Sequence, residues 1–252
     1  MRHAFKISSF AALLVSVGIA SAQPPTTPAP PPVVSPDVSA ARDVTLRVRA
    51  PQADKVSLIS GGDMAAIPFG GGLPMSKGAD GVWQVMIPNV PAGAYRYRFD
   101  IDGVATGDPV NPLTSQSNSN AWSLFYVSGA EFMDAQRVAH GAVAEVTYYS
   151  TALGRDRRMH VYTPPGYERN RETYPVFYLL HGAFDGDDSW STVGRAGFIV
   201  DNLIAANKAV PMIVVMPDGH TSRFGGGGAG GLNMADFVRE FNVDIKAYVE
   251  AN

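Results

Sequence analysis

Residues 174–184 of the sequence, YPVFYLLHGAF, decide how the second half of the chain folds. Residues 176–180 form a continuous apolar run, which is typical of a strand that is buried on both faces of a parallel sheet. His181 and Gly182 follow directly, at the carboxyl end of the strand, where open parallel sheets place their sites. A glycine there lets the chain turn sharply and leaves a backbone N–H free to stabilise an oxyanion, although His-Gly alone also fits an ordinary turn.

A second unit of the same kind follows downstream. Residues 213–216 (IVVM) are another apolar run, and residues 198–207 (FIVDNLIAAN) between the two runs predict a crossover helix. Residues 234–249 predict a further helix with Asn233 as its N-cap. Its apolar face would hold Met234, Phe237, Val238, Phe241, Ile245, Tyr248 and Val249. The alternation of strands and helices predicts a βαβα unit with a right-handed crossover.

Upstream, the pattern indicates an antiparallel pair. Residues 143–149 and 158–162 predict two strands joined by a turn at residues 153–156 (LGRD), and a proline-rich connection (TPPGY) follows at residues 163–167. The predicted sheet therefore has antiparallel strands before its parallel ones.

These motifs together resemble the esterase-D-like α/β-hydrolases, and most closely the secreted feruloyl and related carbohydrate esterases and the enterochelin-esterase-like enzymes. The resemblance covers residues 143–252. It is carried by YTPPGY (162–167), YPVFYLLHG (174–182), D-x-W (188–190), DNLIA (201–205) and PMIVVMPDG (211–219). The family implies hydrolysis of esters by a Ser-Asp/Glu-His triad, often of hydroxycinnamate or acetyl groups on plant polysaccharide. It implies no metal and no organic cofactor.

The resemblance also assigns roles to residues of this chain. Ala183, after the His-Gly pair, would supply one oxyanion N–H. Asp188 and Trp190 match the D-x-W that lines and braces the acyl pocket, and His220 would lie at the same rim as a substrate contact rather than as the catalytic base. The expected substrate-binding residues are thus His181, Gly182, Phe184, Asp188, Trp190 and His220. The glycine-rich residues 225–231 lack the GK[ST] ending of a phosphate loop, and they predict a loop beside the site.

The chain contains no G-x-S-x-G motif, so the nucleophile elbow of the family is absent from it. We therefore expect an N-terminal fragment of a secreted esterase, with the serine, the acid and the histidine outside the 252 residues and no activity by itself. The apolar run at residues 213–216 would then be an exposed sheet edge, which natural proteins avoid. The alternatives are a natural short, non-catalytic glycan-binding protein and a siderophore esterase of the enterochelin type.

Residues 40–131 show a different pattern, in which apolar and polar residues alternate. Predicted strands fall at residues 44–49, 56–58, 83–87, 95–101 and 123–127, separated by turns such as Asp102-Gly103. Together they predict an antiparallel β-sandwich of about 90 residues. Strings such as PAGAYRYRFDIDG (91–103) and DPVNP (108–112) resemble the immunoglobulin-like modules attached to glycan-active enzymes. The aromatics Trp83, Tyr95, Tyr97 and Trp122 could stack on a polysaccharide, although aromatics at strand spacing more often belong to the core.

The N-terminus predicts export. Arg2, His3 and Lys6 precede an apolar run at residues 10–19, and Ala20-Ser21-Ala22 fits a cleavage site, so residues 1–22 read as a signal peptide. The run is too short for a stable membrane insertion. Residues 23–39 are proline-rich and predict an extended linker. The mature protein would be secreted or periplasmic.

Composition excludes several classes. The 252 residues carry a net charge of −3, without the basic surface of a nucleic-acid binder, and no cysteine, which excludes disulfides, thiolate metal sites and cysteine nucleophiles. We expect a multidomain protein, namely an immunoglobulin-like β-sandwich followed by the N-terminal half of an α/β-hydrolase domain at residues 140–252. Its partner would be an ester-bearing carbohydrate or phenolic substrate.

Overall fold

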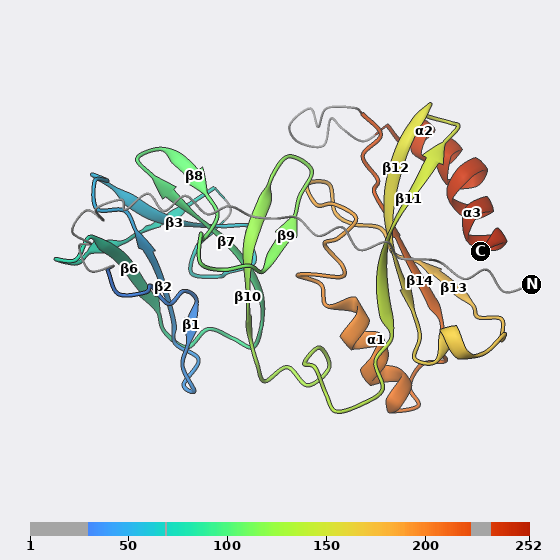
Figure 1. The fold of residues 1–252 in the computed structure, drawn as a ribbon, viewed down its shortest axis with the longest axis horizontal. Helices are drawn as coiled ribbons and strands as arrows, with labels where there is room; N and C mark the ends of the chain where they lie inside the picture. Colours follow the sequence, from blue (N-terminus) through green and yellow to red (C-terminus); the bar gives the residue numbers. More distant parts are fainter. Residues whose placement is uncertain (1–29, 69, 223–232) are drawn as a thin grey trace, which may run out of the picture. The chain divides into compact units, whose positions relative to one another are not determined.

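The computed structural model describes residues 30–68, 70–222 and 233–252. The predicted signal peptide (1–22), the first part of the predicted linker (23–29) and the predicted glycine-rich loop (225–231) lie outside the described residues. Val33–Asn252 form one compact unit. Within it we distinguish a β module (residues 37–127) and an α/β region (residues 142–251), shown in Figure 1.

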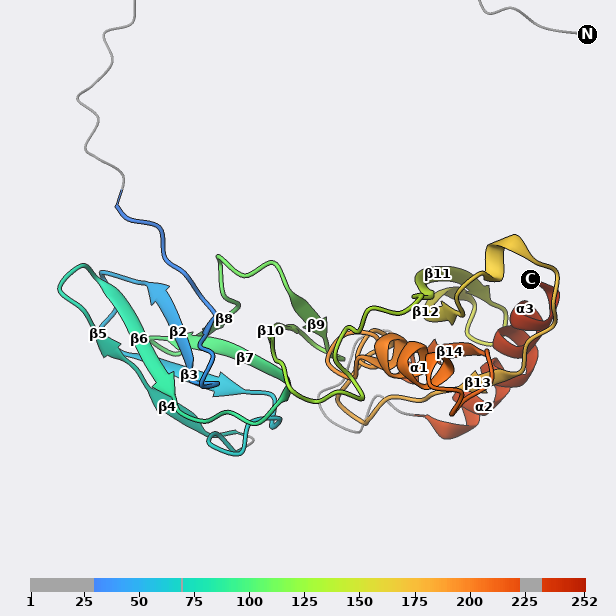
Figure 2. The ribbon, with the colours of Figure 1, turned by 90° about the horizontal axis from the view of Figure 1, so that it is seen from below.

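The β module consists of antiparallel strands in two sheets, which Figure 2 shows from below. One sheet has the order β1-β2-β6-β5, and the other has the order β4-β3-β7-β10-β9, with β8 paired to β7. The strands are β1 Asp37–Val38, β2 Val44–Arg49, β3 Val56–Ser60, β4 Gly72–Pro74, β5 Ser76–Lys77, β6 Val82–Ile87, β7 Gly93–Ile101, β8 Val104–Thr106, β9 Thr114–Gln116 and β10 Ala121–Val127. Each predicted strand of this region is present, and its bounds differ from the prediction by at most two residues.

Alternation builds the core of the β module. In β2 the buried residues are Val44, Leu46 and Val48, and they pack in one cluster with Leu58 of β3 and Phe99 of β7. Since the cluster joins residues of both sheets, the two inner faces close on each other and need no other part of the chain.

The turn between β7 and β8 is the one that the sequence predicts. Asp102 and Gly103 both have positive φ, 51° and 86°, as a two-residue hairpin turn of type I′ requires. The Asp102 carboxylate also accepts the backbone N–H of Lys55 at 2.7 Å, which ties the turn to the start of β3.

Three of the four candidate sugar-stacking aromatics belong to the core. Trp83, Tyr95 and Tyr97 are 7%, 8% and 0% exposed, so they offer no face to a glycan, whereas Trp122 is half-buried. The Tyr97 hydroxyl donates to Asp108 Oδ2 at 2.7 Å. Burial is the main cause that raises the pKa of Tyr97, and the negative charge of Asp108 raises this pKa further. Asp108 belongs to the DPVNP string, which therefore has a structural role here.

The α/β region contains a four-stranded sheet with the order β11-β12-β14-β13. Its elements are β11 Ala142–Ser150, β12 Arg155–Thr163, the 3₁₀ turn Tyr167–Arg169, β13 Val176–Tyr178, α1 Ala196–Ala205, β14 Ile213–Pro217, α2 Met234–Glu240, the π-helical turn Phe241–Ile245 and α3 Lys246–Ala251. The predicted antiparallel pair is β11 and β12, and β13 runs parallel to β14 with α1 between them in the sequence.

Two expectations for this sheet were wrong. The strand β14 is central, because β12 and β13 pair with its two sides, so residues 213–216 form no exposed edge. The edge is β13, whose Phe177 is 51% exposed, so this strand is not buried on both faces. The reason is the strand order, since a later strand inserts between two earlier ones and no sequence pattern within β13 reveals its neighbours.

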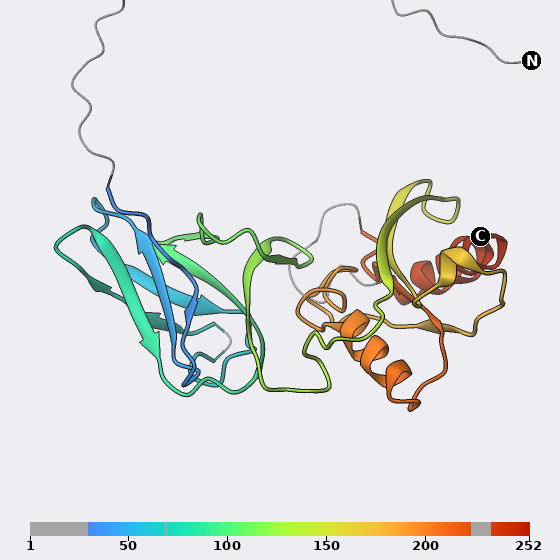
Figure 3. The same cartoon turned by 60° about the horizontal axis from the view of Figure 1, so that its bottom comes forward.

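The helices cover opposite faces of the sheet, as Figures 1 and 3 show. Ala196 of α1 packs with Val214 on one face, while Phe237 and Ile245 of the C-terminal helix pack with Val215 on the other. Asn233 caps α2 as predicted, and its side chain accepts the N–H groups of Ala235 and Asp236.

The predicted apolar face of the C-terminal helix is only partly buried. Met234 and Val238 are 58% and 49% exposed, whereas Phe237 and Ile245 are buried. The π-helical turn Phe241–Ile245 follows, and its wider turn shifts the phase of the residues after it relative to α2.

Candidate active site

The chain turns directly after β13, at residues 182–185. The backbone N–H of Asp185 donates to the Gly182 carbonyl at 3.1 Å, which places Ala183 and Phe184 at the centre of the turn. Ala183 is exposed, and among the described residues no acceptor takes its N–H. Gly182 does not adopt the left-handed conformation; a Cβ there would lie 3.2 Å from Asp185 Oδ2, so space rather than backbone strain favours glycine. The predicted oxyanion donor is therefore accessible and available.

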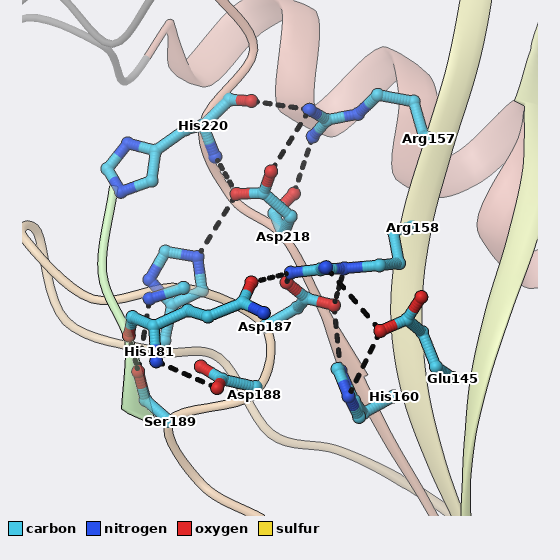
Figure 4. Close-up of polar contacts among 12 residues, drawn as sticks. Glu145, Arg157, Arg158, His160, His181, Asp187, Asp188, Ser189, Asp218 and His220 are labelled. Carbon is cyan, nitrogen blue, oxygen red and sulfur yellow. Dashed lines mark hydrogen bonds and ion pairs between the residues drawn. The ribbon is translucent and has the colours of Figure 1, made fainter. Parts of the chain in front are cut away.

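His181 joins the ends of the two parallel strands. Its Nδ1 donates to the Gly182 carbonyl at 2.7 Å, and its Nε2 accepts the N–H of Gly219 at 2.8 Å. Burial lowers the pKa of His181, but the Asp218 carboxylate, 3.5 Å from Nε2 (Figure 4), and the Gly182 carbonyl raise the pKa above its usual value. The side chain is 5% exposed, so His181 positions the turn instead of facing a substrate directly.

His220 lies in the loop after β14, beside His181, with 5.0 Å between the ring centres. It is 5% exposed, and its Nε2 lies 3.0 Å from the carbonyl of Asp185, which it can approach only as a donor. Its Nδ1 is buried and has no hydrogen-bond partner among the described residues. The ring thus holds the end of the Gly182–Asp185 turn in place.

His181, Asp218 and His220 are the described residues that could hold a metal ion, because each offers one ligand atom and these atoms lie within 4.8 Å of one another. Hydrogen bonds already engage this cluster, since His181 Nε2 accepts the N–H of Gly219 at 2.8 Å and Asp218 Oδ1 accepts the N–H of His220 at 2.9 Å. Arg157 Nη1 also lies 3.3 Å from Asp218 Oδ2 and would repel a cation. The cluster fits a hydrogen-bonded brace better than a metal centre.

A buried network that the sequence did not indicate holds this loop. Arg157 donates to the carbonyls of Asp218 and His220, both at 2.6 Å, and to Glu240 Oε1 at 2.9 Å. Glu240 is fully buried and also accepts the Tyr148 hydroxyl at 2.9 Å. Burial raises the pKa of Asp218, but its hydrogen bond with His181 and the charge of Arg157 lower the pKa below its usual value.

A second network lies under the other end of the loop. Asp187, whose side chain is 2% exposed, accepts Arg158 Nη2 at 2.6 Å and lies 2.8 Å from His160 Nδ1. Burial raises the pKa of Asp187, but these hydrogen bonds outweigh it and bring the pKa down to about 2. No motif marks these residues in the sequence, because Arg158 and His160 look like ordinary outward positions of a strand.

The remaining predicted residues divide into two groups. Phe184 and Trp190 are 55% and 37% exposed, and the Trp190 Nε1–H donates to the Leu180 carbonyl at 2.8 Å. Asp188 is 6% exposed, and its Oδ2 accepts the N–H of Gln116 at 2.8 Å. Burial raises the pKa of Asp188. Asp188 therefore braces the loop, while the two aromatic rings are within reach of a ligand.

The β module contributes contacts to this loop that the sequence analysis missed. Arg96 of β7 forms an ion pair with Asp185, and the N–H of Asn118 donates to the Phe184 carbonyl at 3.0 Å. Ser117 and Asp185 form an isolated antiparallel bridge. Together with the Gln116–Asp188 hydrogen bond, these contacts attach the end of β9 and the two residues after it to the turn that carries Ala183.

Comparisons with known proteins point to esterases. Residues 150–239 match the Esterase family model, described as "Putative esterase". The chain is 33% identical over 217 residues to an endo-1,4-beta-xylanase/feruloyl esterase of Xylanibacter ruminicola, covering 82% of this chain and 29% of that protein. A CE1 ferulic acid esterase of Anaeromyces mucronatus is 29% identical, covering 50% of this chain and 49% of that one, with a TM-score of 0.43.

The fold resembles the enterobactin esterase of Shigella flexneri, with a TM-score of 0.54 and 17% identity, over 83% of this chain and 60% of that one. This likeness concerns the fold alone, and it extends beyond the α/β region. The chain spans less than a third of the Xylanibacter protein and three fifths of the Shigella enzyme. None of the helices in the described residues has the length and apolar character of a membrane span.

Proposed function

We propose that this chain is the N-terminal part of a serine esterase that hydrolyses carboxylic esters of the carbohydrate or feruloyl type. The observation that carries the proposal is the N–H of the exposed Ala183 after β13, which no acceptor among the described residues takes and which lies inside the segment that matches the esterase family model. The serine, the acid and the catalytic histidine would follow residue 252, and the longer relatives support this.

The chemistry would be acyl transfer. A serine would attack the ester carbonyl and form an acyl-enzyme, which water then hydrolyses. The Ala183 N–H would donate to the oxyanion of each tetrahedral intermediate. His181 and His220 would hold the turn in place through Gly219 and Asp185, so the donor needs no reorganisation during the reaction. Phe184 and Trp190 would contact the substrate.

Two chains test the proposal, the 252-residue protein and a form extended by the downstream coding sequence. We expect the extended form to hydrolyse methyl ferulate and the 252-residue form to be inactive. In the extended form, Ala183→Pro removes the N–H and should lower kcat by about 10²–10³-fold, whereas Ala183→Gly keeps it and should change kcat little. Turnover by the 252-residue protein, or full activity of Ala183→Pro, would contradict the assignment.

The substrate class is decided by parallel assays of the extended form. Preference for feruloylated oligosaccharide over enterobactin supports the carbohydrate assignment, and the reverse preference supports a siderophore esterase. If neither is cleaved while insoluble xylan retains the protein, the non-catalytic glycan-binding alternative holds.

Two further parts of the proposal concern the N-terminal residues. We propose that the β module is an immunoglobulin-like domain of the kind attached to glycan-active enzymes, which its two antiparallel sheets support. We also propose export with cleavage after Ala22, on the sequence pattern of residues 1–22. Intact-mass measurement of the protein secreted by a host should give a mature chain that begins at Gln23; a retained N-terminus would contradict export.

A further inference from the structure

A cavity of about 450 Å³ lies where the β module meets the turn that carries Ala183, a size in the usual range of small-ligand sites. The β module supplies Arg96, the loop at residues 117–120 and Trp122, and the turn supplies Ala183, Phe184 and Asp185. The proposed oxyanion donor therefore lies in the wall of a cavity whose other wall is the β module.

Two aromatic rings line this cavity, one from each side. Trp122 of β10 is half-buried, and the Arg98 guanidinium lies 5.3 Å from its ring centre. Phe184 is 55% exposed. Unlike Trp83, Tyr95 and Tyr97, which belong to the core, Trp122 has a face that a ligand can reach.

The polar lining fits a neutral ligand with many hydroxyl groups. Ser117, Ser119 and the amides of Asn118 and Asn120 line the cavity together with Trp122 and offer donors and acceptors. Within this loop Ser117 Oγ donates to the Asn120 carbonyl and Asn120 Nδ2 donates to Ser119 Oγ, which leaves the amide oxygens as acceptors for a ligand. Arg96 adds no free positive charge, because Asp63 and Asp185 both pair with it. Two carboxylates against one guanidinium disfavour an anion such as a catecholate. Amides, hydroxyls and an aromatic face without net positive charge are suited to a sugar.

The contacts around the cavity fix its two walls relative to each other. The Arg96 guanidinium, whose side chain is 11% exposed, links Asp63 of the β module to Asp185 of the turn. The backbone hydrogen bond from Asn118 to Phe184 adds a second link beside it. A ligand that bridges Trp122 and Ala183 would thus meet a preformed site.

We propose that this cavity is the subsite for the alcohol portion of the ester, a neutral sugar, and that the β module thereby forms part of the active site. This inference rests on the proposed function, because an ester carbonyl at the Ala183 N–H directs one of its two substituents into the cavity. An aromatic acyl group would offer the amides of Asn118 and Asn120 no hydrogen-bonding groups, whereas sugar hydroxyls can both donate to these amides and accept from them. Trp122 is then a specificity-determining residue.

The first test uses the 252-residue protein and measures binding without catalysis. Arabinoxylan-derived oligosaccharides, titrated by calorimetry, should bind, and Trp122→Ala should weaken the affinity about tenfold, the upper range for one aromatic contact. Asn120→Ala, at an exposed position, should weaken binding about threefold. Tyr149→Ala removes an aromatic ring that is 60% exposed on β11 and outside the cavity, so it should leave affinity unchanged. Absence of binding, or equal affinity of the Trp122→Ala and unsubstituted proteins, would overturn the proposal.

The second test separates the subsite from the esterase assignment. In the extended form, Trp122→Ala should lower kcat/KM about tenfold for a feruloylated oligosaccharide, chiefly through KM, and leave methyl ferulate hydrolysis unchanged. Equal losses on both esters would overturn the subsite while the esterase assignment stands. If the extended form cleaves neither ester, the proposed function fails, and the subsite for an ester's alcohol portion fails with it even if the oligosaccharide binds.

Discussion

The strands β2 and β13 are both apolar, yet they end in different environments. In β2 every second residue is buried against the opposite sheet, and Val44 and Leu46 are 0% exposed. In β13 the whole run is apolar, but Val176 and Phe177 are 38% and 51% exposed. An alternating strand needs one covering layer, whereas a continuous apolar strand needs cover on both faces. The residues of the β module supply the covering layer that its strands need, whereas the described residues of the α/β region leave part of β13 uncovered.

The interiors also differ in charge. The core of the β module is an apolar cluster, and its ion pair of Arg96 with Asp63 keeps some exposure on both side chains. In the α/β region the carboxylates of Glu240 and Asp187 are 0% and 2% exposed, and they pair with Arg157 and the part-buried Arg158. The stability of the β module should therefore depend on packing, and that of the α/β region on charge and pH.

The largest expected effect on stability comes from a substitution that disrupts the packing of the β module. Phe99→Ala, at a residue that is 0% exposed, should lower the free energy of unfolding by about 3–5 kcal/mol, because it opens a cavity in the core. Phe177→Ala is the matched control on β13, and it should cost less than about 1 kcal/mol, since this ring is already half exposed. Urea unfolding followed by fluorescence measures both, and similar losses would contradict the contrast between the two strands.

A slightly smaller effect is expected from the buried charge of the α/β region. Glu240→Gln keeps the side-chain volume but leaves Arg157 without its buried carboxylate, so it should cost about 3 kcal/mol. Glu250→Gln, which breaks only the exposed pair with Lys246, should change stability little. Thermal unfolding of the three proteins tests this, and an unchanged midpoint for Glu240→Gln would show that the network is not needed for stability.

Asp187 should contribute to the pH dependence of stability. Its folded pKa of about 2 lies below the usual 3.8, so its contribution is present above about pH 4 and is lost as the pH falls toward 2. The loss should be about 2 kcal/mol. Urea unfolding at pH 2–7 measures this, and the free energy of unfolding of Asp187→Asn should fall less steeply with decreasing pH than that of the unsubstituted protein. The neighbouring Asp188→Asn should have the opposite effect, because the pKa of Asp188 is raised. Identical slopes in all three proteins would refute this assignment.

The smallest effect concerns a helix end. Asn233→Ala removes the side-chain acceptor for the N–H groups of Ala235 and Asp236, and it should cost about 1 kcal/mol. Asn233→Ser restores an acceptor and should recover most of the loss. Thermal unfolding measures both variants; no difference between alanine and serine would argue against a capping role.

Local patterns in the sequence predicted the elements well, and long-range pairing was the part that they missed. The alternation at residues 44–49 and the Asp102-Gly103 turn act between near neighbours, so the sequence was sufficient for them. The central place of β14 and the exposed side chains of β13 depend on which elements pair with each strand and cover its faces, and no residue of either strand indicates these partners. The phase shift at residues 241–245 was missed for a related reason, because a π-helical turn has no clear residue signal.

The candidate site divides in the same way. The sequence by itself determined the turn after β13 and the position of Ala183 in it, because the glycine and the strand end act locally. Only the tertiary structure decided that Asp188 is buried against Gln116 and that Arg96 pairs with Asp185. These partners lie 72 and 89 positions apart in the chain, and residues so distant meet only when both regions have folded.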